Sequence, residues 1–271
     1  MASFKVYLIH NQEKDRLIRI RKELKGFYLF SQFQGCTEVF YQRDFKITKP
    51  ALLFRAAEEI RFKILRNFYL ERPVSTLRII VRALRQFMFN FKSVKNIRRF
   101  RSICSVETIV THKHLEVLGN FLNDDVDFAV IIESDAYLLD RQLIAGLGDL
   151  DVYSNTKPMY VNLGQGFDFG RLGVNKLNFT EEITNLSYRF LIFCKCFTNT
   201  NVAYSVNKAM ARKILDKGIR DSKRGFLLPI DWQLDKFFME FEREGVSSKM
   251  LYVLPEPVGH GSRNSDGSWR S

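Results

Sequence analysis

Apolar runs and helical stripes alternate along the chain. Residues 4–9 (FKVYLI) form the first apolar run, and Leu17, Ile20 and Leu24 then recur at helical spacing within residues 12–25. A short apolar run that is followed by a polar turn and an amphipathic helix is typical of a strand–helix unit in a parallel sheet. We therefore expect the chain to begin as an α/β protein.

The same pattern continues along the chain. Apolar runs predict further strands at residues 27–40, 127–133, 158–163, 202–206 and 249–254. Helical periodicity predicts helices at residues 106–122, 207–217 and 231–244. Asn207 is a suitable N-cap for the second of these helices, and Pro229 is well tolerated at the start of the third. Residues beyond 254 are expected to form a loop.

Residues 46–101 differ from the rest of the chain. Their first apolar stripe comprises Leu53, Ala57, Ile60, Ile64 and Phe68, and the second, beyond Pro73, comprises Leu77, Ile80, Leu84, Phe87 and Phe91. The segment holds fifteen Lys or Arg residues against three acids, so it carries the whole net charge of +12. We expect two amphipathic helices with basic faces, inserted into an otherwise neutral single domain that spans residues 1–271.

The basic helices fit an anionic membrane surface. Each Lys or Arg near such a surface contributes on the order of 1 kcal/mol, and apolar faces can enter the headgroup region. The alternative is that the apolar faces complete the core or a dimer interface while the charges are solvated. A nucleic-acid partner is not expected, because the charge is confined to one segment and the sequence has neither a zinc-finger spacing nor an RNP pattern.

The cysteines and the first residues of the sequence predict a reducing, cytoplasmic compartment. The sequence has no run of about 20 apolar residues, and its start, MASFKVYLIHNQEKDR, lacks the pattern of a secretory leader. The spacing of Cys194 and Cys196 is not that of a usual zinc site. With Cys36 and Cys104 they are expected to be free thiols. We expect a cytoplasmic protein that is peripheral on the inner face of the membrane.

Two acidic residues follow the apolar run at residues 127–133. Glu133 and Asp135 flank Ser134 where the predicted strand ends, and ligands of parallel α/β sheets bind beyond the carboxyl ends of the strands. Two carboxylates at such a place can hold Mg²⁺ or Mn²⁺, which in turn can bridge a diphosphate. The alternative is a solvated turn or a helix cap.

Two further features could contribute chemistry. Asp231, in the first turn of a helix, could be a general base for an acceptor hydroxyl, with Trp232 stacked on a sugar ring; alternatively, its charge complements the helix dipole. His260 could be a third metal ligand or a polar surface residue. His112 and His114 are two residues apart in a predicted helix and do not share a face, so no shared metal site is expected.

In order and spacing, these features resemble glycosyltransferase family 25, the sugar transferases of lipopolysaccharide and capsule synthesis. The resemblance rests on the segments VYLIHNQEKDRLIRIRKEL, SVETIVTHKHLEVL, IIESDAYL, VNLGQG, VAYSVNKAMARKIL, LPIDWQLD and PEPVGHGSRNSDGSWRS. It covers residues 4–45 loosely and residues 102–271 well. The family's Glu-Asp-Asp is Glu133-Ser134-Asp135 here, so the middle carboxylate is missing, and His260 replaces the polar residue that usually precedes Gly-Ser.

The resemblance implies a GT-A type fold with a nucleotide-binding half and an acceptor half, built on a mixed, mainly parallel sheet. It also implies transfer of a hexose, galactose or glucose, from a UDP-sugar to an oligosaccharide or lipid-linked glycan acceptor. Mn²⁺ or Mg²⁺ would be the cofactor, and the anomeric carbon would be inverted. The alternative is a catalytically inactive binding or scaffold protein, because one acid of the motif is missing.

The resemblance also implies roles for individual residues. Asp231 is the candidate base, and Glu133, Asp135 and His260 are the candidate metal ligands. The expected donor-binding residues are His10, Asn11, Arg16, Glu133 and Ser134. Arg16 could equally be a solvated helix residue. The expected substrate contacts are Trp232, Gly164 and Gln165.

Overall fold

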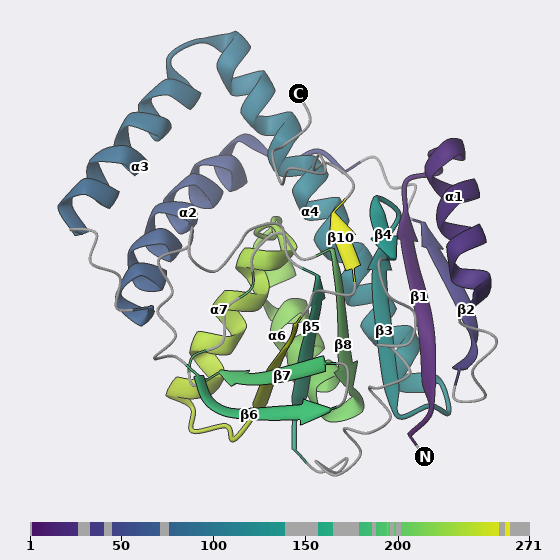
Figure 1. The fold of residues 1–271 in the computed structure, drawn as a ribbon. Helices are drawn as coiled ribbons and strands as arrows, with labels where there is room; N and C mark the ends of the chain where they lie inside the picture. Colours follow the sequence, from purple (N-terminus) through teal and green to yellow (C-terminus); the bar gives the residue numbers. More distant parts are fainter. Residues whose placement is uncertain are drawn as a thin grey trace.

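A mixed sheet with helices on both faces forms the centre of the computed structural model (Figure 1). The structure describes residues 2–26, 33–40, 45–70, 76–138, 157–164, 179–185, 188–193, 195, 198, 202–254 and 258–260. Gln165, Cys194, Cys196 and the interruption at Pro73 lie outside these residues.

Eight described strands form the main sheet, in the order β2-β1-β3-β8-β5-β9-β7-β6. They are β1 (Phe4–His10), β2 (Phe33–Phe40), β3 (Phe128–Glu133), β5 (Met159–Gly164), β6 (Phe179–Asn185), β7 (Tyr188–Phe193), β8 (Ala203–Asn207) and β9 (Lys249–Leu254). A second sheet pairs β4 (Ala136–Leu138) with β10 (Val258–His260). The expected strands at 4–9, 127–133, 158–163, 202–206 and 249–254 are confirmed.

The directions of the strands correct one expectation. Strand β1 runs parallel to β2 and β3, and β5 runs parallel to β9. The other four pairings between described strands of the main sheet are antiparallel: β8 runs against both β3 and β5, and β7 runs against both β6 and β9. The α/β class is therefore confirmed, but the sheet is not mainly parallel. Apolar runs predict that a strand exists and carry no information about its direction.

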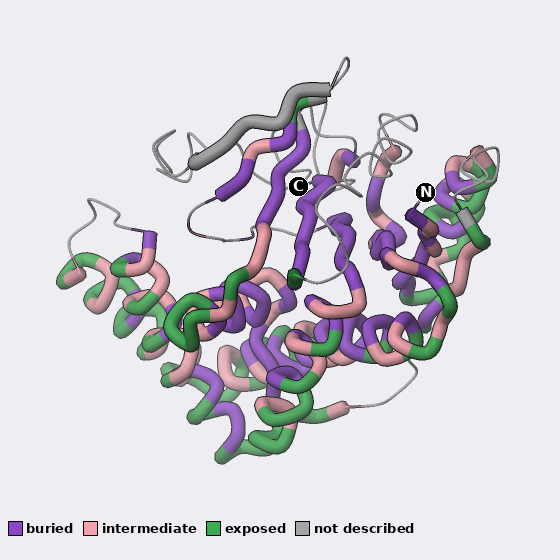
Figure 2. Tube along the Cα trace, turned by 90° about the horizontal axis from the view of Figure 1, so that it is seen from below, coloured by how far each residue is buried: buried purple, intermediate pink, exposed green. Residues whose placement is uncertain are grey.

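Alternating residues of the strands supply two separate cores. Tyr7 and Ile9 of β1 face a core with α4 (Val94–Asn123), α6 (Lys208–Ser222) and α7 (Ile230–Arg243). Val6 and Leu8 face the opposite core, which α1 (Lys14–Leu24) covers. Burial on both faces explains why these strands are continuous apolar runs in the sequence. Figure 2 shows the strands as largely buried, whereas the outer helices alternate between buried and exposed positions.

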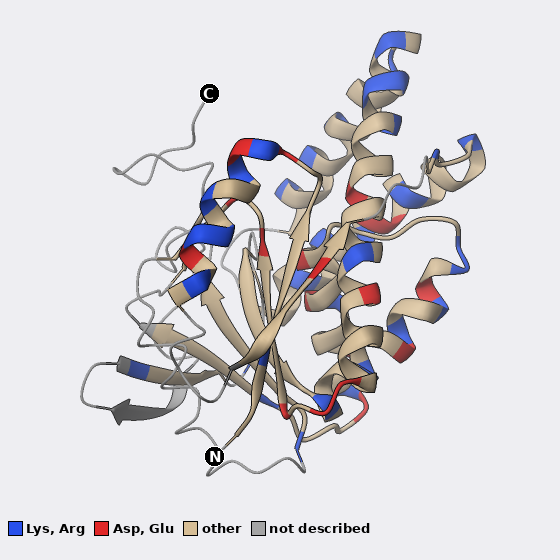
Figure 3. Cartoon of the chain, turned by 90° about the vertical axis from the view of Figure 1, so that its right-hand side faces the viewer, with Lys and Arg blue, Asp and Glu red and all other residues tan. Residues whose placement is uncertain are grey.

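The two expected basic helices are α2 (Lys49–Tyr69) and α3 (Thr76–Phe91). The predicted apolar stripe of α2, however, does not form its buried face, and that of α3 does so only in part, through Phe87 and Phe91, which pack against the small core between α2 and α4. Leu53 and Phe68 of α2 are 50% and 61% exposed, and Leu77 of α3 is 70% exposed. Helix α2 instead buries residues on another face, namely Ala51, Leu52, Arg55, Ala56, Phe62 and Asn67. Figure 3 shows Lys and Arg along the helices, whereas the strands are mostly uncharged.

The basic segment is not separate from the domain at its C-terminal end. Helix α4 starts at Val94 and continues without interruption to Asn123, so the helix expected at residues 106–122 begins twelve residues earlier, inside residues 46–101. Phe100 and Cys104 of α4 share a small core with Leu52 of α2. Within the described residues, every helix is too short or too polar to span a bilayer.

Candidate functional site

The chain turns sharply where β3 ends, between Glu133 and β4. The backbone N–H of Ser134 donates to the carbonyl of Ile9 at 2.8 Å, and Arg19 donates to the carbonyl of Ser134 at 3.2 Å. Ser134 is buried. Its backbone thus ties the turn to β1 and α1, which fixes the positions of the two acids that flank it.

A buried hydrogen-bonded chain orients Glu133. His114 of α4 lies with Nε2 3.0 Å from Glu133 Oε1 and with Nδ1 3.0 Å from the hydroxyl of Tyr204 on β8. Since a carboxylate only accepts, we assign the proton to Nε2, and Nδ1 then accepts from Tyr204. Burial raises the pKa of Tyr204 far above its usual range, which keeps the phenol protonated as a donor.

Asp135 and His260 come together because β10 pairs with β4. His260 is the antiparallel neighbour of Ala136, and this places His260 Nε2 3.8 Å from Asp135 Oδ2. Burial and the nearby Glu133 raise the pKa of Asp135, whereas His260 and Arg16 act in the opposite direction. The other oxygen, Oδ1, is buried without a hydrogen-bond donor among the described residues. A buried acceptor in this state is costly unless a ligand satisfies it.

One pocket of about 220 Å³ joins three of the residues expected from the sequence. Glu133, Asp231 and His260 all line it, together with Glu107 of α4. Its remaining walls are formed by Val106, Val110, Pro229 and Ile230. Strand β3, the start of α7 and strand β10 therefore meet around one cavity, although they are far apart in the sequence.

Asp231 lies in the first turn of α7, as expected. Its backbone carbonyl accepts a 2.8 Å hydrogen bond from the hydroxyl of Thr198. The charge of Asp231 helps to raise the pKa of Glu107, after burial and against the effect of Arg55. Asp231 and Glu107 are thus close enough to interact electrostatically inside the pocket.

The residues at the end of β1 have different surroundings. His10 is buried beside Glu38, with 3.5 Å between His10 Nε2 and a carboxylate oxygen, and burial lowers its pKa. Asn11 is exposed, and its side-chain oxygen accepts from Lys113. Arg16 is half exposed and close enough to lower the pKa of Asp135. Of the three, Arg16 has the clearest electrostatic link to the pocket.

Two residues expected to contact the substrate do not line the pocket that holds Asp231. Trp232 stacks on Phe62 of α2, with 5.3 Å between the ring centroids, and lines a different pocket between α2, α3 and α7. Consecutive residues of a helix point about 100° apart, so Asp231 and Trp232 diverge. Gly164 is buried at the end of β5, where an added Cβ would lie 2.4 Å from the carbonyl oxygen of Val258. Gly164 therefore makes room for β10, and Gln165 lies outside the described residues.

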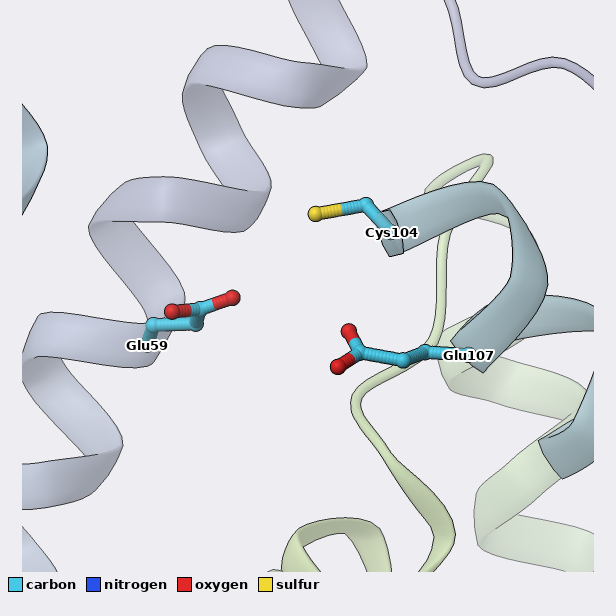
Figure 4. A group of neighbouring side chains, drawn as sticks. All are labelled: Glu59, Cys104 and Glu107. Carbon is cyan, nitrogen blue, oxygen red and sulfur yellow. The ribbon is translucent and has the colours of Figure 1, made fainter. Parts of the chain in front are cut away.

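A second acidic cluster is already neutralised. In the described part of the chain, Glu59, Cys104 and Glu107 are the only three candidate metal ligands whose atoms lie within 4.8 Å of one another (Figure 4). The buried guanidinium of Arg55, however, lies 3.0 Å from Glu59 and 2.6 Å from Glu107. Burial also raises the pKa of Cys104 to about 12, so its thiol stays protonated. This cluster is an ion-pair network that joins α2 to α4, and a metal would have to displace Arg55.

Asp135 and His260 are the better fit for a divalent cation. They offer a buried oxygen without a donor and an imidazole nitrogen, beside the negative charge of Glu133. Carboxylate oxygens suit Mn²⁺ and Mg²⁺, and imidazole is a common ligand of transition metals.

Three residues of the site were not expected from the sequence. Glu107 and His114 lie seven residues apart on α4 and so share a face, and Lys113 donates to the carbonyl of His10 at 2.8 Å. Two polar residues two turns apart on an otherwise apolar helix face could have indicated this role.

No protein-family model matches this chain, and no curated protein matches it either.

Proposed function

We propose that the protein is a metal-dependent glycosyltransferase that transfers a hexose, galactose or glucose, from a UDP-sugar to a glycan acceptor. One observation supports this most directly: Glu133, Asp231 and His260, which are far apart in the sequence, line one pocket at the end of β3. Asp135 adjoins it through His260. Acids at a strand end, opposite a third acid on a helix, suit a reaction in which a diphosphate leaves and a hydroxyl attacks.

In the proposed reaction, the acceptor hydroxyl attacks the anomeric carbon from the side opposite the UDP group. Asp231 takes the proton of that hydroxyl as the new C–O bond forms. The bond between the anomeric carbon and the diphosphate oxygen breaks, and its electron pair leaves with UDP. Asp135 and His260 would hold Mn²⁺ or Mg²⁺, which when bound offsets the negative charge of the diphosphate. Arg16 supplies a further positive charge on the same side.

The GT-A type assignment belongs to this proposal. Strand β1, the first in the chain, lies between β2 and β3, and all three run parallel. Their carboxyl ends therefore meet at one edge, where Glu133, Ser134 and the end of β1 lie. Ligands of α/β sheets bind at such edges, so the placement favours a nucleotide site there.

We further propose that the acceptor is met at an anionic membrane surface. Leu77, Leu84 and Met88 recur along α3 and are 70%, 48% and 70% exposed. The same helix carries Arg78, Arg82 and Arg85. An exposed apolar stripe with flanking arginines is typical of helices that lie in a headgroup region.

The proposal is tested by measuring UDP release from a panel of UDP-sugars with and without Mn²⁺. We expect metal-dependent turnover with at least one donor. Asp231→Asn should lower kcat/KM about 10²- to 10⁴-fold, while donor binding, followed by thermal shift, remains. Asp216→Asn, on the exposed side of α6, is the matched control and should retain activity. If no donor gave metal-dependent release of UDP, the proposed enzymatic activity would be refuted.

One observation favours a non-catalytic alternative. The candidate ligands Glu133, Asp135 and His260 are not drawn together within 4.8 Å, and Ser134 stands where the related motif has an acid. A protein that binds UDP-sugars without turning them over would show a thermal shift with the donor and no UDP release, with or without an acceptor.

A further inference from the structure

The basic segment forms a second pocket on the other side of the start of α7. It has a volume of about 340 Å³ and lies between α2, α3 and α7. Phe62 of α2 and Trp232 of α7 are stacked within its wall. Its described lining includes three basic side chains and no acidic one; the basic residues are Lys63, Arg66 and Arg82.

The aromatic and basic groups of this pocket are held in place. The Lys63 ammonium lies 5.1 Å from the centre of the Trp232 ring. Arg66 Nε lies 2.7 Å from the buried carboxylate of Asp235, and its Nη2 donates to the carbonyl of Thr198 at 2.8 Å. Such fixed groups lose little freedom when a ligand binds.

Thr198 connects the two pockets. Its carbonyl accepts from Arg66, and its hydroxyl donates to the backbone carbonyl of Asp231. Trp232 follows Asp231 in the sequence, so the second pocket begins one residue from the proposed base. An acceptor that spans both pockets around the start of α7 would therefore place one sugar unit against Trp232 and a hydroxyl near Asp231.

From these contacts we propose that the pocket between α2, α3 and α7 binds a negatively charged sugar unit of the acceptor, one that carries a phosphate or a carboxylate. Aromatic rings stack on the C–H face of a sugar, and Lys and Arg pair with phosphate or carboxylate oxygens. The proposal rests on the proposed transferase function for its role, but the binding itself does not depend on catalysis.

The test uses the fluorescence of Trp232 in the full chain. The sequence has two tryptophans, Trp232 and Trp269, so Trp269→Phe leaves Trp232 as the sole reporter. The variant is titrated, without UDP-sugar or metal, with galactose 1-phosphate and with a glucuronate-ended oligosaccharide. Galactose and lactose are the neutral controls, and vesicles containing phosphatidylglycerol provide the lipid phosphate.

We expect saturable quenching or shift of the Trp232 emission with the anionic sugars and a much weaker response to the neutral sugars. Lys63→Gln and Arg82→Gln, in the same background, should each weaken binding about tenfold or more, because each removes a charge-assisted contact. Arg85→Gln is the matched control, since Arg85 is an exposed arginine of α3 outside the pocket lining.

Three results would overturn the proposal: no saturable response to either anionic sugar, an equal response to neutral sugars, or a response to the vesicles alone. The outcome is separate from that of the transferase assay. Binding of anionic sugars without any UDP release would support the sugar-binding pocket and contradict the transferase function. UDP release without such binding would support the transferase function and contradict the sugar-binding pocket.

Discussion

Two residues from two other elements determine how Glu133 is presented to the pocket. Tyr204 on β8 and His114 on α4 form a buried chain that ends at one oxygen of Glu133. Mutation of a group that orients a metal-binding or catalytic carboxylate in this way typically lowers metal affinity or activity 10- to 100-fold. His114 is therefore a positioning residue: it contacts Glu133 but does not itself line the pocket.

We expect His114→Phe to weaken Mn²⁺ binding about 10- to 100-fold, because the aromatic ring fills the space but cannot hold Glu133. Titration calorimetry with Mn²⁺ alone measures this, and circular dichroism verifies the fold. His112→Phe is the control, since His112 packs edge-on against Phe45 and does not line the pocket. Equal Mn²⁺ affinity of the His114 variant and the wild type would contradict the positioning role.

Asp235 gives a pH-dependent contribution to stability. It is completely buried, and its burial raises the pKa of the carboxyl to about 7 in spite of Arg66. The unfolded value is about 3.9. The folded state therefore binds the proton more tightly, so this contribution to stability is fully present below about pH 4 and is lost as the pH rises to about 7.

The amide in Asp235→Asn cannot ionise, so this variant lacks the pH-dependent contribution. We expect the difference in Tm, wild type minus Asp235→Asn, to fall as the pH rises from about 4 to about 7. Thermal denaturation at a series of pH values measures the difference. Asp216→Asn should give a flat difference over the same range, because Asp216 is exposed. If the difference for Asp235→Asn instead increased with pH, the Arg66 ion pair would outweigh the burial.

At the residue scale, the sequence predicted which side chains share the pocket better than it predicted the residues that orient them. Glu133, Asp231 and His260 were expected to act together, and they share a pocket. Trp232 lines a different pocket from Asp231, since adjacency in sequence is not adjacency on a helix, and its contact with a sugar stays a prediction. The role of His114 depends on Tyr204, a residue of a distant strand, and no local pattern reports such a pairing.

At the scale of elements, the short strand β10 brings His260 to Asp135. Its pairing with β4 requires Gly164 on β5, because an added Cβ there would lie 2.4 Å from the Val258 carbonyl oxygen and 3.0 Å from a methyl carbon of Val202. A side chain at residue 164 would therefore push the backbone of β10 away from its present position.

We expect Gly164→Ala to destabilise the protein by about 1–3 kcal/mol through overpacking and to weaken Mn²⁺ binding, since β10 and His260 would shift. Denaturant unfolding and Mn²⁺ titration measure the two effects. Gly119→Ala is the matched control. Its Cβ would meet only Leu215, at 3.9 Å, so it should be neutral or add up to about 1 kcal/mol of helix stability. Full Mn²⁺ affinity in Gly164→Ala would show that His260 is not needed.

Elements that bury a continuous apolar run could be predicted from the sequence, and those that depend on distant contacts could not. Strands β1, β3, β5, β8 and β9 belong to the first group. Strand β10 has three residues, one of them Gly259, and pairs with β4 where only a loop was expected. The helices α2 and α3 were predicted correctly, but the buried face of α2 was not and that of α3 only in part, because periodicity identifies a stripe without showing what covers it.

At the scale of the whole molecule, charge and exposed apolar surface coincide on the basic segment. The excess of basic residues lies within residues 46–101, and the exposed stripe of Leu77, Leu84 and Met88 runs along α3 within it. Attraction of exposed charges to an anionic surface is screened by salt, whereas insertion of apolar side chains is not. The two contributions can therefore be separated by experiment.

We expect the protein to sediment with phosphatidylglycerol vesicles at low salt and less so at about 1 M salt. The triple variant Leu77→Ser, Leu84→Ser, Met88→Ser should lower the partition coefficient at least about tenfold, because it removes the inserting side chains. Ile18→Ser and Ile219→Ser, exposed on α1 and α6, are the controls. Equal recovery of the wild type and the triple variant in the supernatant would exclude the α3 stripe as a membrane contact.

The pairing of β4 with β10 has a consequence for the order of events during synthesis. By the time residue 254 has left the ribosome, every strand of the main sheet is available, yet His260 has not emerged to meet Asp135. A nascent chain arrested at that point could acquire its core while remaining unable to bind the cation that we propose. The order of synthesis therefore allows the main sheet to fold before the proposed cation site can form.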